Sequence, residues 1–382
     1  MEALSDIRKE IDAIDGEIAQ LFVRRMKAAA SVAAAKRESG KPVLDPARER
    51  AVLAKAAAAV GPDFESEGRL LFSTLMALSR EYQRRLLSTG GAFVRMLEKA
   101  VADTPPRFPT QATVACPGAE GGYSQQAASA LVQTPSILYF KDFNAVFSAV
   151  EQGMCEYGVL PVENSAAGSV TQVYDLMAKH DFKIVKAKKL RIRHVLLAQR
   201  GVRLGDVREI ASHPHALAQC SEFLQEHPDV KAVPASNTAA AADALAKSGR
   251  RDAAVIASRD CAALYGLDVL AEDISDAASN YTRFILISRK CEIYPDASKV
   301  SLTMSLAHRP GALADVLMRF AAAGVNLAKL ESRPVPGSDF EFRFVFDLEA
   351  SPRDPAVADL LAGLAGDPSV ERFVFLGGYA EH

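Results

Sequence analysis

The stretch VLPVENSAAGSV, residues 159–170, decides how the middle of this chain folds. Its apolar start is typical of a buried strand, and the strand ends with the polar residues Glu163 and Asn164. A turn of small residues through Gly168 follows, and we expect a helix to begin at Ser169. The stretch therefore indicates an α/β domain with polar groups gathered where a core strand ends.

Three further junctions between an apolar strand and a helix carry Ser, Thr, Asn or Gly. We expect these helices to begin at Ser124, at Ser212 and at Asn237–Thr238. Any one of them fits ordinary N-capping. The free amides at helix starts also bind anions, so four such junctions in one segment predict a cleft lined by hydroxyls and amides. Such a cleft suits a small ligand that carries carboxylates.

The composition excludes several classes of protein. A chain of 382 residues with 49% hydrophobic and 24% charged residues is an ordinary globular protein of two or three domains. A net charge of −2 provides no basic field for nucleic acid or for an anionic membrane. The five cysteines are widely spaced and form no C-x-x-C pair, and we find no signal peptide and no apolar run that could span a bilayer. We expect a cytoplasmic protein with no metal and no cofactor.

The pattern of apolar residues divides the chain into three expected domains. Residues 1–90 are all-helical, and a Pro-rich linker at 102–110 follows them. Residues 111–292 alternate short strands and helices, which predicts a two-lobed α/β domain similar to periplasmic binding proteins. Residues 298–382 have the order β-α-β-β-α-β, which is typical of a ferredoxin-like α+β domain.

The helical segment places cations where apolar side chains are expected. Apolar residues recur in steps of three and four over residues 4–35, which predicts one long helix packed lengthwise against others. Arg25 lies on this seam and could simply extend to solvent at the end of the bundle. Lys36 returns to the same face, and two inward cations need anions, which a dianionic ligand would supply. Arg8 lies about 25 Å before Arg25, so it reaches that ligand only from a second copy of the chain, which predicts an intertwined dimer.

The first segment resembles the helical chorismate mutase domain of the bifunctional chorismate mutase/prephenate dehydratase family. The resemblance runs through RRMKAAASVAAAKRESGKPVLDPARER and continues at FSTLMALSREYQ. It implies a substrate site made of Arg8 from the partner subunit, Arg25, Lys36, Asp45, Arg48, Glu49, Ser79 and Gln83.

The chemistry of chorismate rearrangement fits these residue types. The reaction is an intramolecular Claisen rearrangement, so the enzyme needs only to hold the compact conformer and stabilise charge on the breaking ether oxygen. We expect Arg8 and Arg25 to clamp the two carboxylates, while Lys36 and Gln83 donate to the ether oxygen. Glu49 is suited to accept a hydrogen bond from the ring hydroxyl. Asp45 fits an N-cap of the second helix equally well, with Pro46 at the first helical position.

The central segment resembles prephenate dehydratases. The motifs GGYSQQA, ENSAAGSV, SHPHALAQC and NYTRF occur in order across it. The resemblance implies an active site made of Glu163, Asn164, Ser212, Gln219, Thr282 and Arg283. Prephenate loses carbon dioxide and its ring hydroxyl together, and we expect Thr282 to donate to the leaving hydroxyl. Arg283 either supplies a cation or forms a structural ion pair.

The third segment resembles the amino-acid-sensing ACT domains of this family through HRPGALADVL and KLESRPVPGSDFEF. The resemblance implies that L-phenylalanine binds between two ACT domains and lowers dehydratase activity. The implied effector residues are Gly311, Ala312, Leu313, Glu331, Ser332, Arg333 and Pro334. A dimerisation module without a ligand is the alternative for this segment.

We therefore expect a homodimer or higher homo-oligomer that converts chorismate to prephenate and prephenate to phenylpyruvate, with feedback inhibition by L-phenylalanine. The alternative is a cytoplasmic regulatory protein that binds a small carboxylate and has lost one or both activities. A solute receptor would carry a signal peptide, and a transcription regulator would carry a basic recognition helix.

Overall fold

The computed structural model describes residues 4–87, 91–277, 279–335 and 342–382. It divides into two compact units that are described separately below. The first unit comprises Met1–Glu98, Thr303–Val345 and Asp354–Val374. The second unit comprises Lys99–Leu302, Phe346–Arg353 and Phe375–His382.

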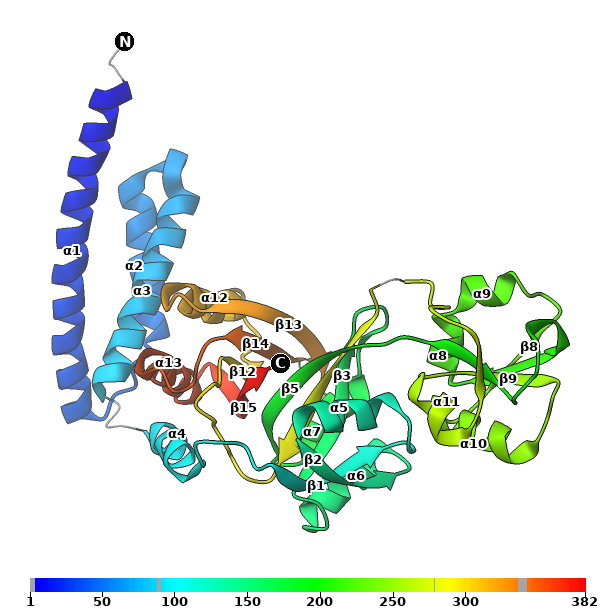
Figure 1. The fold of residues 1–382 in the computed structure, drawn as a ribbon. Coiled ribbons are helices and arrows are strands. Elements are labelled where there is room, and N and C mark those ends of the chain that lie inside the picture. Colours follow the sequence, from blue (N-terminus) through cyan, green and yellow to red (C-terminus); the bar gives the residue numbers. More distant parts are fainter. Residues whose placement is uncertain (1–3, 88–90, 278, 336–341) are drawn as a thin grey trace. The chain divides into compact units, whose positions relative to one another are not determined.

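The N-terminal helices form the first part of the first unit (Figure 1). They are α1 (Leu4–Ser39), α2 (Pro46–Val60), the 3₁₀ turn η1 (Pro62–Phe64) and α3 (Glu65–Leu87). Both α1 and α2 pack against α3. The side chain of Asp45 accepts a hydrogen bond from the Arg48 N–H at 3.0 Å, so the predicted N-cap of α2 is confirmed.

A further helix, α4 (Ala92–Asp103), was not expected from the sequence and includes the first residues of the predicted linker. No helix in the described part of the chain is both long and apolar enough to cross a membrane.

The C-terminal domain has the predicted order of elements. These are β12 (Lys299–Leu306), α12 (Ala312–Ala322), β13 (Asn326–Pro334), β14 (Phe342–Glu349), α13 (Pro355–Ala365) and β15 (Val370–Glu381). The strands follow the order β13-β14-β12-β15, so the expectation of an α+β domain is confirmed. Within the first unit, α13 packs against α3.

The second unit contains two lobes, whose strands belong to two different sheets (Figure 1). In the first lobe, β5 also pairs with β15. The strands of the first lobe are ordered β5-β11-β3-β1-β2, with β4 beside β3. Its elements are β1 (Gln111–Pro117), α5 (Tyr123–Leu131), β2 (Thr134–Phe140), α6 (Phe143–Glu151), β3 (Tyr157–Asn164), β4 (Gly168–Ser169), α7 (Thr171–Lys179), β5 (Lys183–Arg191) and β11 (Tyr281–Ser288).

The second lobe is built on a five-stranded sheet of order β10-β6-β9-β7-β8. Its elements are β6 (Val195–Ala198), η2 (Leu204–Asp206), β7 (Glu209–Ser212), α8 (Pro214–Ala218), α9 (Ser221–Gln225), β8 (Lys231–Pro234), α10 (Thr238–Ser248), β9 (Ala253–Ala257), α11 (Asp260–Tyr265) and β10 (Asp268–Ala271). The chain passes between the lobes twice, at residues 192–194 and 272–280.

The stretch at 159–170 folds as a core strand followed by a tight turn. Strand β3 pairs with β11 in antiparallel register, which sets Asn164 opposite Thr282. The expected helix start at Ser169 is wrong, because Ser169 pairs with Glu163 in the short strand β4 and α7 begins two residues later. Gly168 has φ = +78°, a conformation that favours glycine and lets the chain turn there.

Candidate active sites

A cleft of about 660 Å³ is lined by residues from both lobes of the second unit. The starts of α5, α7 and α10 line it together with the last residues of β3 and the first residues of β11. These helices have nine to eleven residues, and their first amides carry a partial positive charge. The cleft therefore provides three sets of amide donors for the carboxylates of a small ligand.

Thr282 lies in this cleft and is oriented by Asn164. The Asn164 Nδ2 donates to Thr282 Oγ1 at 2.9 Å. The other end of the same amide is fixed, because Asn164 Oδ1 accepts from the N–H groups of Ala166 and Ala167 at 3.0 and 2.9 Å. Since the Thr282 oxygen accepts from Asn164, its own proton is directed away from that amide.

Gln219 reaches the same cluster from the second lobe. Its Nε2 donates to Asn164 Oδ1 at 3.3 Å, and its Oε1 accepts from Asn280 Nδ2 at 3.1 Å. The Nε2 of His194 lies 3.0 Å from the same Gln219 oxygen. Burial lowers the pKa of His194, although the hydrogen bond to Gln219 acts in the opposite direction.

Sequence reasoning missed Asn280 and His194. Asn280 is the first residue of the NYTRF motif, so the motif itself was a signal that could have included it among the site residues. His194 stands outside every recognised motif, because it lies in the segment that crosses from one lobe to the other.

Two residues predicted for the cleft lie elsewhere. Ser212 is fully buried in the second lobe, and its hydroxyl donates to the Ile256 carbonyl at 2.6 Å. Glu163 is not among the residues that line the cleft, and its register partner on β11 is Arg283. The next residue of β3, Asn164, does line the cleft.

Arg283 is held in a buried ion-pair network rather than in the cleft. Its guanidinium is paired with Asp347 and lies 2.6 Å from both Glu381 and the Tyr379 hydroxyl. Ser301 hydrogen-bonds to Asp347 and Tyr379 in the same cluster. The structure therefore favours the ion pair that the sequence left open and contradicts a role for Arg283 as a substrate contact.

The helical bundle brings Arg25 and Ser79 together. Arg25 Nη1 donates to the Leu75 carbonyl at 2.7 Å and to the Ser79 hydroxyl. Burial lowers the pKa of the Arg25 guanidinium. Lys36 Nζ donates to the Val43 carbonyl at 2.5 Å. Within the described residues neither cation forms an ion pair.

Gln83 is buried one turn along α3 from Ser79. Its Oε1 has no hydrogen-bond partner among the described residues. A buried polar atom without a partner is costly, so this oxygen marks a position where a ligand group would be stabilised.

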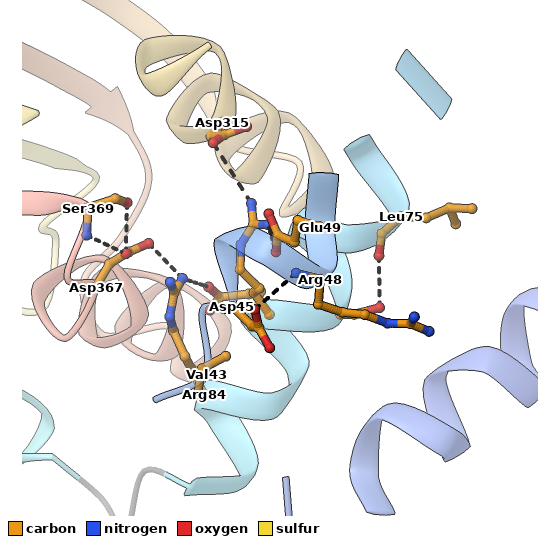
Figure 2. A network of polar contacts seen from close by, with 12 residues as sticks. Val43, Asp45, Arg48, Glu49, Leu75, Arg84, Asp315, Asp367 and Ser369 are labelled. Atoms are coloured by element: carbon orange, nitrogen blue, oxygen red, sulfur yellow. Dashed lines mark hydrogen bonds and ion pairs between the residues drawn. The ribbon is translucent and has the colours of Figure 1, made fainter. Parts of the chain in front are cut away.

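The remaining predicted mutase residues have other contacts or are exposed. Glu49 is paired with Arg80 at 2.5 Å, and Asp45 serves as the N-cap described above (Figure 2). The side chains of Arg8 and Arg48 are exposed in the single chain.

A stripe of large apolar side chains on α1 is also exposed. These residues are between 40 and 64% exposed, although they occupy the positions that the sequence assigns to a packed seam. They are Leu4, Ile7, Ile11, Ile14, Ile18 and Leu21. A contiguous exposed apolar surface of this kind is typical of an interface with another chain.

An ion-pair network connects α3 to α12 and to the turn that follows α13 in the C-terminal domain (Figure 2). Arg84 contacts Asp367 at 2.6 Å, and Arg319 contacts the same carboxylate. Arg319 also lies 3.4 Å from Glu81. Burial alone would raise the pKa of Asp367, but Arg319, Arg84 and hydrogen bonds from Ser369 hold that pKa below its usual range.

The predicted effector residues lie on two elements. Gly311 has φ = +80° and precedes α12, which Ala312 and Leu313 begin. The other four end strand β13, which stands at the edge of the sheet order. Among them, Glu331 is paired with Arg333 at 3.3 Å.

Comparisons with known proteins place these domains in defined families. The model for chorismate mutase type II matches residues 7–84, the model for prephenate dehydratase matches 114–292, and the ACT domain model matches 300–366. A helical mutase domain, a dehydratase with two lobes and an ACT domain in one chain define a class of enzymes of phenylalanine biosynthesis.

The bifunctional chorismate mutase/prephenate dehydratase of Escherichia coli K12 is 30% identical over 354 residues, covering 90% of this chain and 88% of that protein. The chain belongs to the family of bifunctional chorismate mutase/prephenate dehydratases. It is therefore an enzyme with both activities, an isomerase and a carbon–oxygen lyase.

Two further comparisons concern the dehydratase and ACT regions. The chloroplastic arogenate dehydratase/prephenate dehydratase 2 of Arabidopsis thaliana is 38% identical over 263 residues, covering 66% of this chain and 68% of that protein. The crystal structure of prephenate dehydratase in complex with L-Phe from Arthrobacter aurescens is 35% identical, with a TM-score of 0.64. It covers 70% of this chain and 89% of that one.

Proposed function

We propose that the cleft of the second unit is the dehydratase site and that Thr282 assists the leaving hydroxyl. As the carboxylate departs as carbon dioxide, the electrons of its C–C bond enter the ring, and the C–O bond breaks with its electron pair on oxygen. Thr282 donates a hydrogen bond to that oxygen, which leaves as hydroxide and takes its proton from solvent to become water. The observation that carries this proposal is the hydrogen bond from Asn164, which leaves the Thr282 proton available to a ligand.

The first backbone amides of α5, α7 and α10 are proposed to hold the substrate carboxylates. Asn164 and Gln219 orient the reacting groups, and the apolar core of β3 and β11 behind them keeps the site dry. Glu163 remains a substrate contact only by resemblance.

A direct assay tests the two-step function. Purified full-length protein supplied with chorismate should consume it and release phenylpyruvate, which is followed in alkali by its ultraviolet absorbance. Arogenate supplied in place of prephenate is the informative second substrate, because an Arabidopsis relative carries both names. Consumption of chorismate without phenylpyruvate would contradict the dehydratase assignment.

We propose that the mutase site forms in an intertwined homodimer. Arg25, Lys36, Ser79 and Gln83 would hold chorismate with Arg8 of the partner subunit, and Glu49 would exchange its contact with Arg80 for the ring hydroxyl. The exposed stripe on α1 supports this proposal, because burial of six large apolar side chains stabilises association. The variant Ile14→Glu should shift the mass measured by light scattering toward the monomer, whereas a monomeric wild-type protein with full mutase activity would contradict it.

We propose that L-phenylalanine binds at the loop around Gly311 and the end of β13 and inhibits the dehydratase. The L-Phe complex of the Arthrobacter relative supports the choice of ligand. Titration calorimetry with L-phenylalanine should detect binding to the wild-type chain and weaker binding to Leu313→Ala. An ACT domain that serves only for dimerisation would bind no L-phenylalanine. We also propose the domain bounds 1–90, 111–292 and 298–382 and a location in the cytoplasm.

A further inference from the structure

Three side-chain amides form a closed ring beside Thr282. Asn164 Nδ2 donates to Asn280 Oδ1 at 2.7 Å, and Asn280 Nδ2 donates to Gln219 Oε1 at 3.1 Å. Gln219 Nε2 donates in turn to Asn164 Oδ1 at 3.3 Å. The ring joins β3 of the first lobe, α8 of the second lobe and the segment that returns between them.

The order of donors and acceptors around this ring is fixed by backbone groups at Asn164. The N–H groups of Ala166 and Ala167 both donate to Asn164 Oδ1, so this end of the amide is the acceptor. Each remaining amide then has only one orientation in which a donor faces an acceptor. A reversal of Gln219 would set its oxygen against the oxygen of Asn164.

The fixed ring determines the protonation of His194. Gln219 Oε1 can only accept, so the His194 Nε2 that faces it at 3.0 Å must carry a proton. On the other side of the imidazole, Nδ1 lies 3.0 Å from the hydroxyl of Tyr123, which also contacts the Arg193 carbonyl at 2.6 Å. Nε2 carries its proton whichever of these two acceptors receives the Tyr123 proton.

We infer that His194 and Asn280 are positioning residues of the dehydratase reaction. Asn280 closes the ring of amides, His194 fixes the Gln219 member of that ring, and the ring turns the Thr282 hydroxyl proton toward the substrate. His194 is 3% exposed and Asn280 is 2% exposed, so neither bond competes with bulk water. His194 fixes Gln219, Asn280 links Gln219 to Asn164, and Asn164 donates to Thr282. This inference rests on the proposed role of Thr282.

Steady-state kinetics of the full-length chain test the inference. His194→Phe keeps a ring of similar size but removes the donor, and we expect the dehydratase kcat to fall about tenfold while KM for prephenate changes less than about twofold. His194→Gln supplies an amide donor near the position of Nε2 and should recover most of the lost kcat. A wild-type kcat in His194→Phe, or no recovery in His194→Gln, would overturn the inference.

A second variant breaks the ring without changing its shape. Asn280→Asp still accepts from Asn164 but sets a carboxylate oxygen against Gln219 Oε1, so the dehydratase kcat should fall more than tenfold. An unchanged kcat in this variant would also overturn the inference. His180→Phe is the matched control, because His180 contacts Glu151 on α6 and lies outside the cleft lining.

Two readouts separate this result from misfolding and from failure of the site assignment. The mutase kcat of each variant should equal that of the wild type. If Thr282→Ala retains dehydratase activity, the proposed site is wrong, whereas a normal His194→Phe beside an inactive Thr282→Ala rejects only the ring. In ¹⁵N-histidine spectra of the full chain, the resonance lost in His194→Phe should report a protonated Nε2, and an unprotonated Nε2 would overturn the inference.

Discussion

The dehydratase cleft and the mutase helices differ in how far a single chain completes them. In the cleft, Asn164 contacts both Thr282 and Gln219 and is itself held by backbone N–H groups of the same chain. On the helices, Arg25 and Lys36 have no carboxylate partner among the described residues, and a long apolar stripe on α1 faces solvent. This difference supports our proposal that the dehydratase site assembles within one chain, whereas the mutase site requires a second copy.

The largest expected effect tests whether the two sites are separate. Thr282→Ala removes the donor to the leaving hydroxyl, and the dehydratase kcat should fall about 10²–10³-fold while the mutase kcat stays unchanged. The absorbance assays for chorismate and phenylpyruvate measure both on one sample. Arg25→Ala should give the reverse pattern, and loss of both activities from either substitution in a folded protein would contradict separate sites.

Mixing two inactive variants tests whether the mutase site is shared between subunits. Arg8→Ala and Arg25→Ala should each lack mutase activity, but a 1:1 mixture refolded together should recover about a quarter of it. Half of the dimers are then mixed, and each mixed dimer has one intact site. The dehydratase activity of the mixture serves as the control for refolding, and no recovery of mutase activity would contradict the shared site.

Arg283 tests how the cleft strand β11 is supported. Arg283→Met leaves the buried carboxylate of Asp347 without its ion-pair partner, whereas Glu381 keeps Lys299 at 2.7 Å. The free energy of unfolding should therefore fall by roughly 3–5 kcal/mol. KM for prephenate should change less than about twofold. A tenfold rise in KM with unchanged stability would restore Arg283 as a substrate contact.

Lys189 provides the matched control for that experiment. It contacts the same Glu381 at 3.3 Å, but its side chain is 59% exposed. Lys189→Met should therefore change the free energy of unfolding by about 0–1 kcal/mol. Urea denaturation of both variants makes the comparison.

The smallest expected effect concerns the contact of α3 with the C-terminal domain. The pKa of Asp367 is lower in the folded state than in the unfolded chain. Asp367 therefore stabilises the fold at a pH above its pKa in the unfolded chain, and this stabilisation is lost as the pH falls through its pKa in the folded state. Unfolding by urea at a series of pH values measures this effect. The free energy of unfolding should decline less below about pH 4 in Asp367→Asn than in the wild type. Asp6→Asn, in an exposed pair with Lys9, should keep the wild-type decline.

Local signals explain what the sequence predicted correctly. The apolar spacing of α1, the cap at Asp45 and the strand at 159–164 depend on neighbouring residues, and the structure agrees with them. Resemblance of motifs also placed Thr282, Asn164 and Gln219, which the structure brings together in one cleft.

The errors arose where distant residues decide the structure. Ser169 pairs with Glu163 instead of starting a helix, and Ser212 donates to a carbonyl 44 residues away. Arg283 finds its partners 64 to 98 residues later in the chain. His194 has no local signal at all, because its role depends on amides from three separate segments.

Helix α3 carries two unrelated sets of contacts on adjacent faces. Ser79 contacts Arg25 of the mutase bundle, while Arg84 contacts Asp367 of the C-terminal domain. Arg80 contacts both parts, through Glu49 of α2 and Asp315 of α12. A one-residue insertion before Ser79 would rotate both sets by about 100°. Substitutions along this helix can therefore be tolerated more easily than insertions or deletions. The same helical spacing positions residues for the substrate of one domain and for contacts with another domain.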